Sequence, residues 1–161
     1  MIILDGKKTS SDIKDEIASE VKSITLSGDR PPHLAALIVG NDGASLTYVG
    51  SKVKACEKVG FDSTLLSLPE SISEQELLSK VYELNNDDKI DGYIVQLPLP
   101  NHIDTQKVLM AVDPKKDVDG FHPTNFGKMA LKLPTFISAT PNGIMELLLS
   151  LIHISEPTRR Y

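Results

Sequence analysis

His33 to Gly40 reads HLAALIVG, and this apolar run decides the fold of the chain. A continuous apolar run, in place of an alternating one, is typical of a strand that is buried on both faces of a sheet. Such strands belong to parallel sheets, because the helices that connect parallel strands cover both faces. The run therefore predicts a mainly parallel sheet with helices on both faces.

Two more short segments on the C-terminal side of this run, 61–68 and 91–96, are predicted strands. Between the strands, apolar residues recur at the spacing of a helix, which predicts helices over 11–27, 44–59, 73–86 and 103–112. Ser73 and Glu76 have the spacing of a capping box. The alternation of strands and helices predicts right-handed crossovers and a single three-layer α/β domain.

The composition of the 161 residues narrows the class of protein. Lys and Arg number 17 and Asp and Glu 22, which gives a net charge of −5, and only 5% of the residues are aromatic. A nucleic-acid binder usually has a basic face and stacking aromatics, so we expect no nucleic-acid partner. No apolar run approaches the roughly 20 residues that span a bilayer, so we expect no membrane partner.

The single cysteine, Cys56, cannot form an internal disulfide, which favours a reducing, cytoplasmic compartment. It falls on the apolar side of its predicted helix, so we interpret it as a core residue. The four histidines lack zinc-site spacing, so no metal site is predicted. The turn at 40–43 has neither a GxGxxG nor a GK[ST] motif, and the chain therefore has no visible nucleotide site.

Lys52 interrupts the apolar face of the helix predicted over 44–59, and Tyr48 lies one turn earlier on the same face. An amine that is held against apolar surface gives up its proton more easily, because burial disfavours its charged form. Such an amine suits proton transfer near neutral pH. The alternative is a lysine whose stem covers the core while its ammonium group reaches water.

Gln96 ends the third predicted strand and precedes Leu97-Pro98-Leu99-Pro100. Ligands of parallel sheets bind beyond the carboxyl ends of the strands, and a side-chain amide there can donate and accept at once. The prolines stiffen the loop, and one of their peptide bonds is a candidate for the cis form. The alternative is a glutamine that bonds only to the neighbouring backbone.

Asp113, Asp117 and Asp119 superficially resemble a calcium loop, but the pattern would require acids where Lys115 and Phe126 stand. We therefore interpret the first two carboxylates as turn caps. Asp119 is a candidate for binding an amidine-like edge through paired hydrogen bonds.

His122, which follows this loop and precedes Pro123, is expected to shape the chain at least as much as to catalyse.

Four segments, taken together and in order, resemble the bifunctional methylenetetrahydrofolate dehydrogenase/methenyltetrahydrofolate cyclohydrolase family. They are VGNDGASLTYVGSKVKACEKVGF (39–61), DGYIVQLPLP (91–100), DPKKDVDGFHPTNFGKM (113–129) and ATPNGI (139–144). The combination of YxxxK, VQLPLP and DVDGFHP is highly specific. The resemblance implies that residues 1–148 form the family's folate-binding catalytic domain, and that its second, Rossmann domain is missing.

The resemblance also implies the roles of individual residues. Lys52 is expected to be the key catalytic residue, with Gln96 assisting it and Asp119 holding the pterin. Tyr48 is expected to pack on the folate. The implied substrate-binding residues are Tyr48, Lys52, Val95, Gln96, Leu97 and Asp119.

The implied activity belongs to one-carbon folate metabolism. The full-length parent is expected to oxidise 5,10-methylenetetrahydrofolate to 5,10-methenyltetrahydrofolate with NADP or NAD, and to hydrolyse the product to 10-formyltetrahydrofolate. The nicotinamide cofactor is expected to bind the missing half, so this fragment is expected to lack dehydrogenase activity. The family's homodimer is expected to be weakened. A non-catalytic folate-binding or interaction module is the alternative function.

Leu149 to Arg159 reads LSLIHISEPTR, which looks like the translation of a sequencing adaptor. We therefore expect residues 149–161 to be a non-native tail on a truncated domain. The alternative is a genuine short paralogue with a divergent end.

Overall fold

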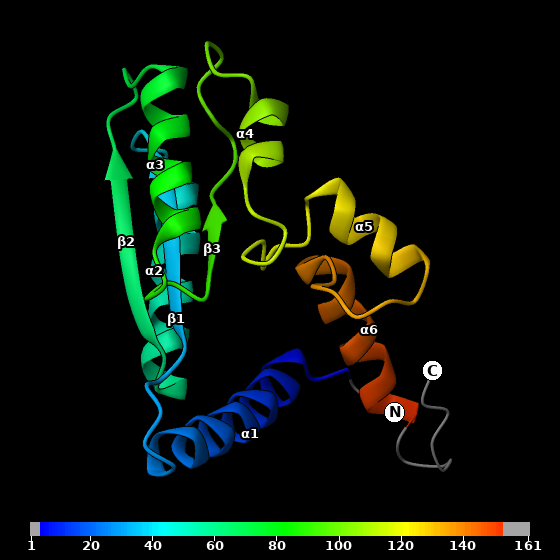
Figure 1. Cartoon of the computed structure of the whole chain (residues 1–161). Coiled ribbons are helices and arrows are strands. Elements are labelled where there is room, and N and C mark those ends of the chain that lie inside the picture. The colour runs from blue at the N-terminus through cyan, green and yellow to red at the C-terminus, as the bar shows by residue number, and fades with distance from the viewer. Residues whose placement is uncertain (1–3, 153–161) are drawn as a thin grey trace.

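The computed structural model describes residues 4–152 and alternates helices with strands (Figure 1). No helix in this range is both long and apolar enough to cross a membrane. In chain order the elements are α1 (Gly6–Leu26), β1 (His33–Val39), α2 (Gly43–Val59), β2 (Asp62–Leu68), α3 (Glu74–Asn86), β3 (Gly92–Val95), α4 (Thr105–Ala111), α5 (Pro123–Ala130) and α6 (Ala139–Ile152).

The three strands form a parallel sheet in the order β2-β1-β3, with the predicted apolar run at its centre. His33 of β1 lies opposite Asp62 of β2, and Leu34 lies opposite Gly92 of β3. A central strand is covered on both faces, and this explains why polar residues do not alternate with apolar ones along β1. The predicted parallel sheet is confirmed.

Successive residues of β1 pack into two cores on opposite faces of the sheet. One core combines Ala35, Leu37 and Val39 with the buried faces of α3 and α4, and the other combines Ala36 and Ile38 with α2. Figure 1 shows α3 and α2 at the sheet, with α5 and α6 set to one side. The predicted three-layer α/β architecture is confirmed.

Helix ends follow local capping, and this corrects two predicted boundaries. The first helix was predicted to begin at residue 11, but α1 begins at Gly6, because the Asp5 carboxylate accepts a hydrogen bond from the Lys8 N–H at 2.9 Å. The first turn of α1 is polar, so it lacks the periodic apolar residues by which a helix is predicted. The helix predicted from 103 begins at Thr105, because Asp104 caps it. The capping box of Ser73 and Glu76 is confirmed.

Helices α5 and α6 add to the elements that periodicity predicts. Pro123 occupies the start of α5, where its fixed φ angle suits a first turn. Helix α6 passes the predicted domain boundary at residue 148 and runs to Ile152. The rest of the predicted tail, 153–161, lies outside the described residues, so the boundary stays a prediction.

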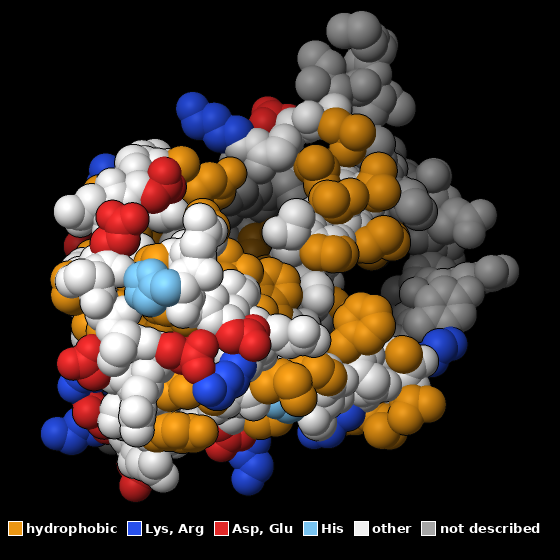
Figure 2. All heavy atoms as spheres, turned by 90° about the horizontal axis from the view of Figure 1, so that it is seen from above, with side chains coloured by type: hydrophobic (Ala, Val, Ile, Leu, Met, Phe, Trp, Pro, Cys, Tyr) orange, Lys and Arg blue, Asp and Glu red, His pale blue; other side chains and the backbone are white. Residues whose placement is uncertain are grey.

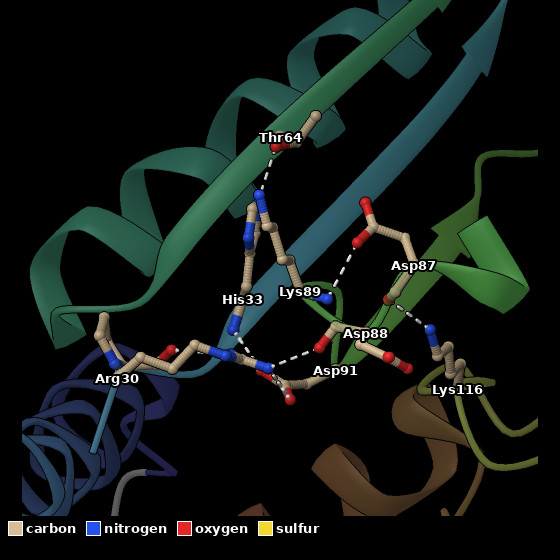
Figure 3. A network of polar contacts seen from close by, with 9 residues as sticks. Arg30, His33, Thr64, Asp87, Asp88, Lys89, Asp91 and Lys116 are labelled. Atoms are coloured by element: carbon tan, nitrogen blue, oxygen red, sulfur yellow. Dashed lines mark hydrogen bonds and ion pairs between the residues drawn. The ribbon is translucent and has the colours of Figure 1, made fainter. Parts of the chain in front are cut away.

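An ion pair with hydrogen bonds to the backbone ties the strands together at their amino ends (Figure 3). The guanidinium group of Arg30 donates to both carboxylate oxygens of Asp91, at 2.6 and 2.8 Å, and to the carbonyl of Asp88 at 3.1 Å. Asp91 also accepts the N–H of His33 at 2.8 Å, and the His33 ring bonds the Thr64 hydroxyl on β2. These contacts connect β1 to both neighbouring strands.

The Arg30 hydrogen bonds hold the pKa of Asp91 below its usual value, so Asp91→Asn is expected to weaken the fold in a pH-dependent way. A carboxyl whose pKa is lowered by folding stabilises the protein above the unfolded pKa, and that stability disappears as the pH falls through the folded pKa. Because solvent screens this half-exposed pair, the expected loss is a few degrees of melting temperature at pH 7. Thermal unfolding from pH 7 down to about pH 3 measures it.

Asp88→Asn is the matched control, because Arg30 contacts only the backbone carbonyl of Asp88. The difference between Asp91→Asn and wild type should begin to shrink near pH 4, the ordinary aspartate pKa, and go on shrinking as the pH falls toward the lowered pKa of the folded state. A difference that stays constant down to pH 3 would show that the charge of Asp91 contributes nothing.

Candidate active site

Lys52 is positioned by α2, whose two ends are fixed by local chemistry. The Asp42 carboxylate accepts the Ser45 N–H and hydroxyl, both at 2.8 Å, and starts the helix. Gly60 ends it with a φ of 83°, a conformation that favours glycine. Lys52 is half-buried, whereas Tyr48, one turn earlier, is 66% exposed and free to meet a ligand.

Gln96 directly follows β3, and its N–H donates to the Leu37 carbonyl of β1 at 2.8 Å. Its side-chain amide donates to the carbonyl of Leu97 at 2.8 Å, which is the backbone contact that the sequence left open as the alternative. The Leu97–Pro98 bond is cis, as one of the candidate bonds was expected to be. Gln96 is therefore fixed at the carboxyl end of the sheet.

Val95 and Leu97, the other two candidates on this segment, direct their side chains into the core on the α3 side of the sheet. The Val95 side chain is 5% exposed there, whereas that of Leu97 is half-buried. Val95 can therefore meet a ligand only through its backbone, and its role, like that of Leu97, stays a prediction.

Asp119 lies in a loop that runs alongside β3 like a short fourth strand. The Tyr93 N–H donates to the Lys116 carbonyl at 2.9 Å, and Tyr93 forms a parallel bridge with Asp117. Gly92 permits this approach, because a Cβ there would meet the Val118 side chain at 2.3 Å. Parallel pairing at Tyr93 carries Asp119 toward the end of β3, where Gln96 follows.

The charge of Lys52 is one of the influences on the pKa of Asp119. Burial raises the pKa of Asp119 above its usual value, the positive charge of Lys52 opposes this, and the negative charge of Asp117 adds to it. The charge of Lys52 therefore acts on the Asp119 carboxylate, although the two side chains form no direct ion pair. These two side chains, from α2 and from the loop beside β3, form the centre of the site.

The other polar residues of the loop shape the backbone, as the sequence predicts. Asp113 accepts the Lys115 N–H at 2.8 Å, and Asp117 accepts those of Phe121 and His122 at 3.2 and 2.8 Å. His122 in turn caps α5 by accepting the Thr124 N–H at its Nδ1 atom. Both turn caps and the shaping role of His122 are confirmed. Cys56 is buried and free, as expected of a core residue.

Asn125 and Thr135 are structural parts of the site that the sequence interpretation missed. Asn125 is 1% exposed, and its amide donates to the Pro114 carbonyl and to Asp117 while it accepts the Thr135 hydroxyl at 2.7 Å. A single asparagine inside a short helix belongs to no sequence motif that would mark it as part of a site. The only available signal was its place two residues after Pro123, in the first turn of a helix.

A large cavity coincides with the candidate residues only at Lys52. A cavity of about 670 Å³ lies between α1, α2 and α6, and it contains Lys52 and Val118 but not Tyr48, Gln96 or Asp119. A second hollow of about 480 Å³ lies at the carboxyl ends of β1 and β3. We define the site by Lys52, Gln96 and Asp119, because their polar groups can take part in chemistry and the cavity of about 670 Å³ is mostly hydrophobic.

Beside the site, α5, α6 and the segment between them expose many large hydrophobic side chains. Figure 2, which looks onto the carboxyl ends of the strands, shows hydrophobic side chains gathered over this part and a hollow between it and the sheet. The exposed residues are Phe126, Leu131, Leu133, Phe136, Ile137, Ile144, Met145, Leu148 and Leu149. A patch of this kind is typical of a surface that another chain segment or partner covers.

The turn from β1 to α2 is unsuited to a phosphate. The Asp42 carboxylate already occupies the N-terminus of α2, and the hydrogen bond from the Ser45 N–H lowers its pKa, so it is ionised near neutral pH. A fixed negative charge there repels the pyrophosphate of a dinucleotide. Within residues 4–152, no three His, Cys, Asp or Glu side chains gather where they could hold a metal ion.

Comparisons with known proteins point to one family. The family model described as "Tetrahydrofolate dehydrogenase/cyclohydrolase, catalytic domain" matches residues 4–119. The "Bifunctional protein FolD" of Flavobacterium johnsoniae is 72% identical over 148 residues, which are 92% of this chain and 50% of the relative. That of Bacteroides thetaiotaomicron is 58% identical over the same coverage. The chain spans about half the length of the curated relatives it matches.

Solved structures agree in fold. The bifunctional methylenetetrahydrofolate dehydrogenase/cyclohydrolase FolD of Campylobacter jejuni is 43% identical, with a TM-score of 0.90 over 94% of this chain and 54% of that one. The 5,10-methylenetetrahydrofolate dehydrogenase of the silkworm Bombyx mori is 40% identical, with a TM-score of 0.91 over 93% and 52%. A Trypanosoma brucei enzyme complexed with NADP and an inhibitor is 31% identical, with a TM-score of 0.88 over 93% and 52%.

Proposed function

The chain belongs to the tetrahydrofolate dehydrogenase/cyclohydrolase family, and we propose that its site binds tetrahydrofolate derivatives and hydrolyses 5,10-methenyltetrahydrofolate to 10-formyltetrahydrofolate. The observation that carries this proposal is that the charge of the half-buried Lys52 on α2 acts on the half-buried Asp119 of the loop beside β3. One side chain can move a proton, and the other can hold a ring that presents N–H groups.

Asp119 is proposed to hold the pterin ring. A pterin presents a ring N–H beside an amino group, and the two oxygens of one carboxylate can accept both. Because Asp119 is partly desolvated, it gains more from these donors than a carboxylate in water would. This binding fixes the orientation of the folate and hence the position of its reactive carbon.

Lys52 is proposed to move the proton during hydrolysis. Water adds to the methenyl carbon of a cationic substrate and loses one proton. Its other proton ends on the nitrogen that is released when one C–N bond of the bridge breaks, so the product is a neutral formyl compound and one proton is set free. An amine that has released its own proton can take the proton of the water, whereas an ammonium group that stayed charged beside the cation would repel it, so the positive charge that Lys52 presents to Asp119 must be given up before this step. The half-buried place of Lys52 on α2 keeps the amine beside the site.

Gln96 and Tyr48 complete the proposed site. Gln96 is held at the end of β3, and its amide oxygen is able to accept a hydrogen bond from the attacking water or from the Lys52 amine. Tyr48 has an exposed ring on the same face of α2 as Lys52, where it can stack on the folate. Val95 is proposed to contribute through its backbone, and Leu97 through its backbone and the exposed part of its side chain.

The dehydrogenase reaction of the full-length parent is a further part of this proposal. It needs NADP or NAD, and we propose that this cofactor binds outside residues 1–148, because Asp42 disfavours a pyrophosphate at the α2 N-terminus. We also propose that a second domain covers the apolar surface of α5 and α6, that dimer contacts lie mostly beyond this chain, and that the protein acts in the cytoplasm.

Binding and hydrolysis of 5,10-methenyltetrahydrofolate by the purified chain test the proposed function. Asp119→Asn keeps the size of the side chain but places an amide N–H₂ group against the pterin donors. We expect affinity to fall by roughly 10- to 100-fold, because a charge-assisted pair of hydrogen bonds is lost. Titration calorimetry measures the binding, and the absorbance of the methenyl compound follows its hydrolysis.

Asp113→Asn is the matched control, because an asparagine oxygen can still accept the Lys115 N–H. Equal affinity of Asp119→Asn and wild type would remove Asp119 from the site. Binding without any turnover by the wild-type chain would favour the alternative function, a non-catalytic folate-binding module.

A further inference from the structure

A buried polar cluster of Asp117, Asn125 and Thr135 lies next to the loop that carries Asp119. Asp117 and Asn125 are 5% and 1% exposed, and Thr135 is half-buried. The Thr135 hydroxyl donates to Asn125 Oδ1 at 2.7 Å, and Asn125 Nδ2 donates to Asp117 Oδ2 at 2.9 Å. A buried network whose members are all hydrogen-bonded favours one conformation over its alternatives.

The cluster holds the Asp119 loop from both sides along the chain. Before Asp119, the Asn125 amide donates to the Pro114 carbonyl at 2.8 Å. After Asp119, the Asp117 carboxylate accepts the N–H groups of Phe121 and His122. The two ends of the loop are thus fixed to the same pair of buried side chains.

The segment that follows α5 closes the loop from outside. The Ser138 hydroxyl donates to the Gly120 carbonyl at 3.1 Å, and the Ala139 N–H donates to the Asp119 carbonyl at 3.4 Å. Thr135, three residues before Ser138, ties this segment to Asn125. The position of Thr135 therefore bears on the backbone of Asp119 itself.

We propose that Asp117, Asn125 and Thr135 are positioning residues, which hold the loop of Asp119 so that its carboxylate meets the pterin. The significance for folate rests on the proposed function. The charged groups that act on the Asp119 carboxylate are Lys52 on α2 and Asp117 in its own loop. Any movement of the loop changes both the burial of Asp119 and the charges that it meets.

Thr135→Val tests the proposal, because it removes the hydroxyl at nearly constant size and leaves the buried Asn125 oxygen without this donor. We expect the loop to loosen and water to enter, so the pKa of Asp119 should fall toward its ordinary value. Carboxyl ¹³C NMR of the ligand-free chain measures that titration. Affinity for 5-formyltetrahydrofolate should weaken about tenfold.

Thr135→Ser keeps the hydroxyl and should restore both the titration of Asp119 and the affinity. If Thr135→Val folds poorly, Thr135→Ala takes its place, because alanine also lacks the hydroxyl group. A merely structural Thr135 would lower the melting temperature without moving the Asp119 titration, and that result would overturn the proposal. A wild-type chain that binds no folate would defeat the proposed function and leave the titration test standing.

Discussion

Lys52→Met is expected to lower the rate of methenyltetrahydrofolate hydrolysis by about 10²- to 10⁴-fold, the usual contribution of a general acid–base group. Methionine keeps a long apolar stem against α2 and its neighbours but has no proton to move. The fold should therefore survive. The rate is measured in the 161-residue chain and in a chimera in which residues 1–148 replace the matching half of the Flavobacterium johnsoniae relative.

Lys54→Met is the matched control, because Lys54 lies on the same helix, two residues further on, with an exposed side chain. It should leave the rate within about twofold, since surface substitutions away from a site have small effects. Wild-type hydrolysis in Lys52→Met would sink the assignment of Lys52 as the proton-transfer group. Unchanged folate affinity in the same variant would place its role in turnover alone.

The sheet and most helices could be predicted because their signals are local. The apolar run of β1 needs both faces covered, whatever the rest of the chain does. The capping box of α3 depends only on residues three apart. The start of α1 was missed because one carboxylate, Asp5, begins a helix whose first turn has no apolar pattern.

The candidate site was predictable in part for a similar reason. Lys52 stood out because it breaks the apolar face of a helix, and Gln96 because it ends a buried strand. What the sequence left open for Gln96 was its partner, and the structure gives the Leu97 carbonyl as the acceptor of its amide. Sequence spacing predicts on which face or at which end of an element a side chain lies, whereas its hydrogen bonds depend on the three-dimensional surroundings.

The cluster around Asn125 lay beyond sequence interpretation because its members come from separate segments. Asp117 precedes α5, Asn125 lies within it, and Thr135 follows it, so no fixed spacing marks the set. Asp117 was correctly interpreted as a turn cap. Its second role, as acceptor for a buried amide, depends on the path of the chain after α5, which periodicity did not predict.

Gly120→Ala is expected to destabilise the chain by about 2–5 kcal/mol and to abolish folate binding. Gly120 has a φ of 68°, which an alanine adopts only with strain. A Cβ there would also lie 2.6 Å from the Ser138 nitrogen and 2.8 Å from the Ile137 carbonyl carbon. Those atoms are backbone, so they move only if the whole segment between α5 and α6 shifts. Urea unfolding and calorimetric folate binding measure the two effects.

Gly127→Ala, in the neighbouring α5, separates a site effect from a general intolerance of larger residues. Gly127 lies within a helix, and a Cβ there meets nothing within 4 Å, so alanine should stabilise by roughly 0.5–1 kcal/mol. Because Gly120 directly follows Asp119, the same clash that costs stability displaces the carboxylate. A Gly120→Ala chain that keeps wild-type stability and affinity would contradict the close packing of this loop against Ser138.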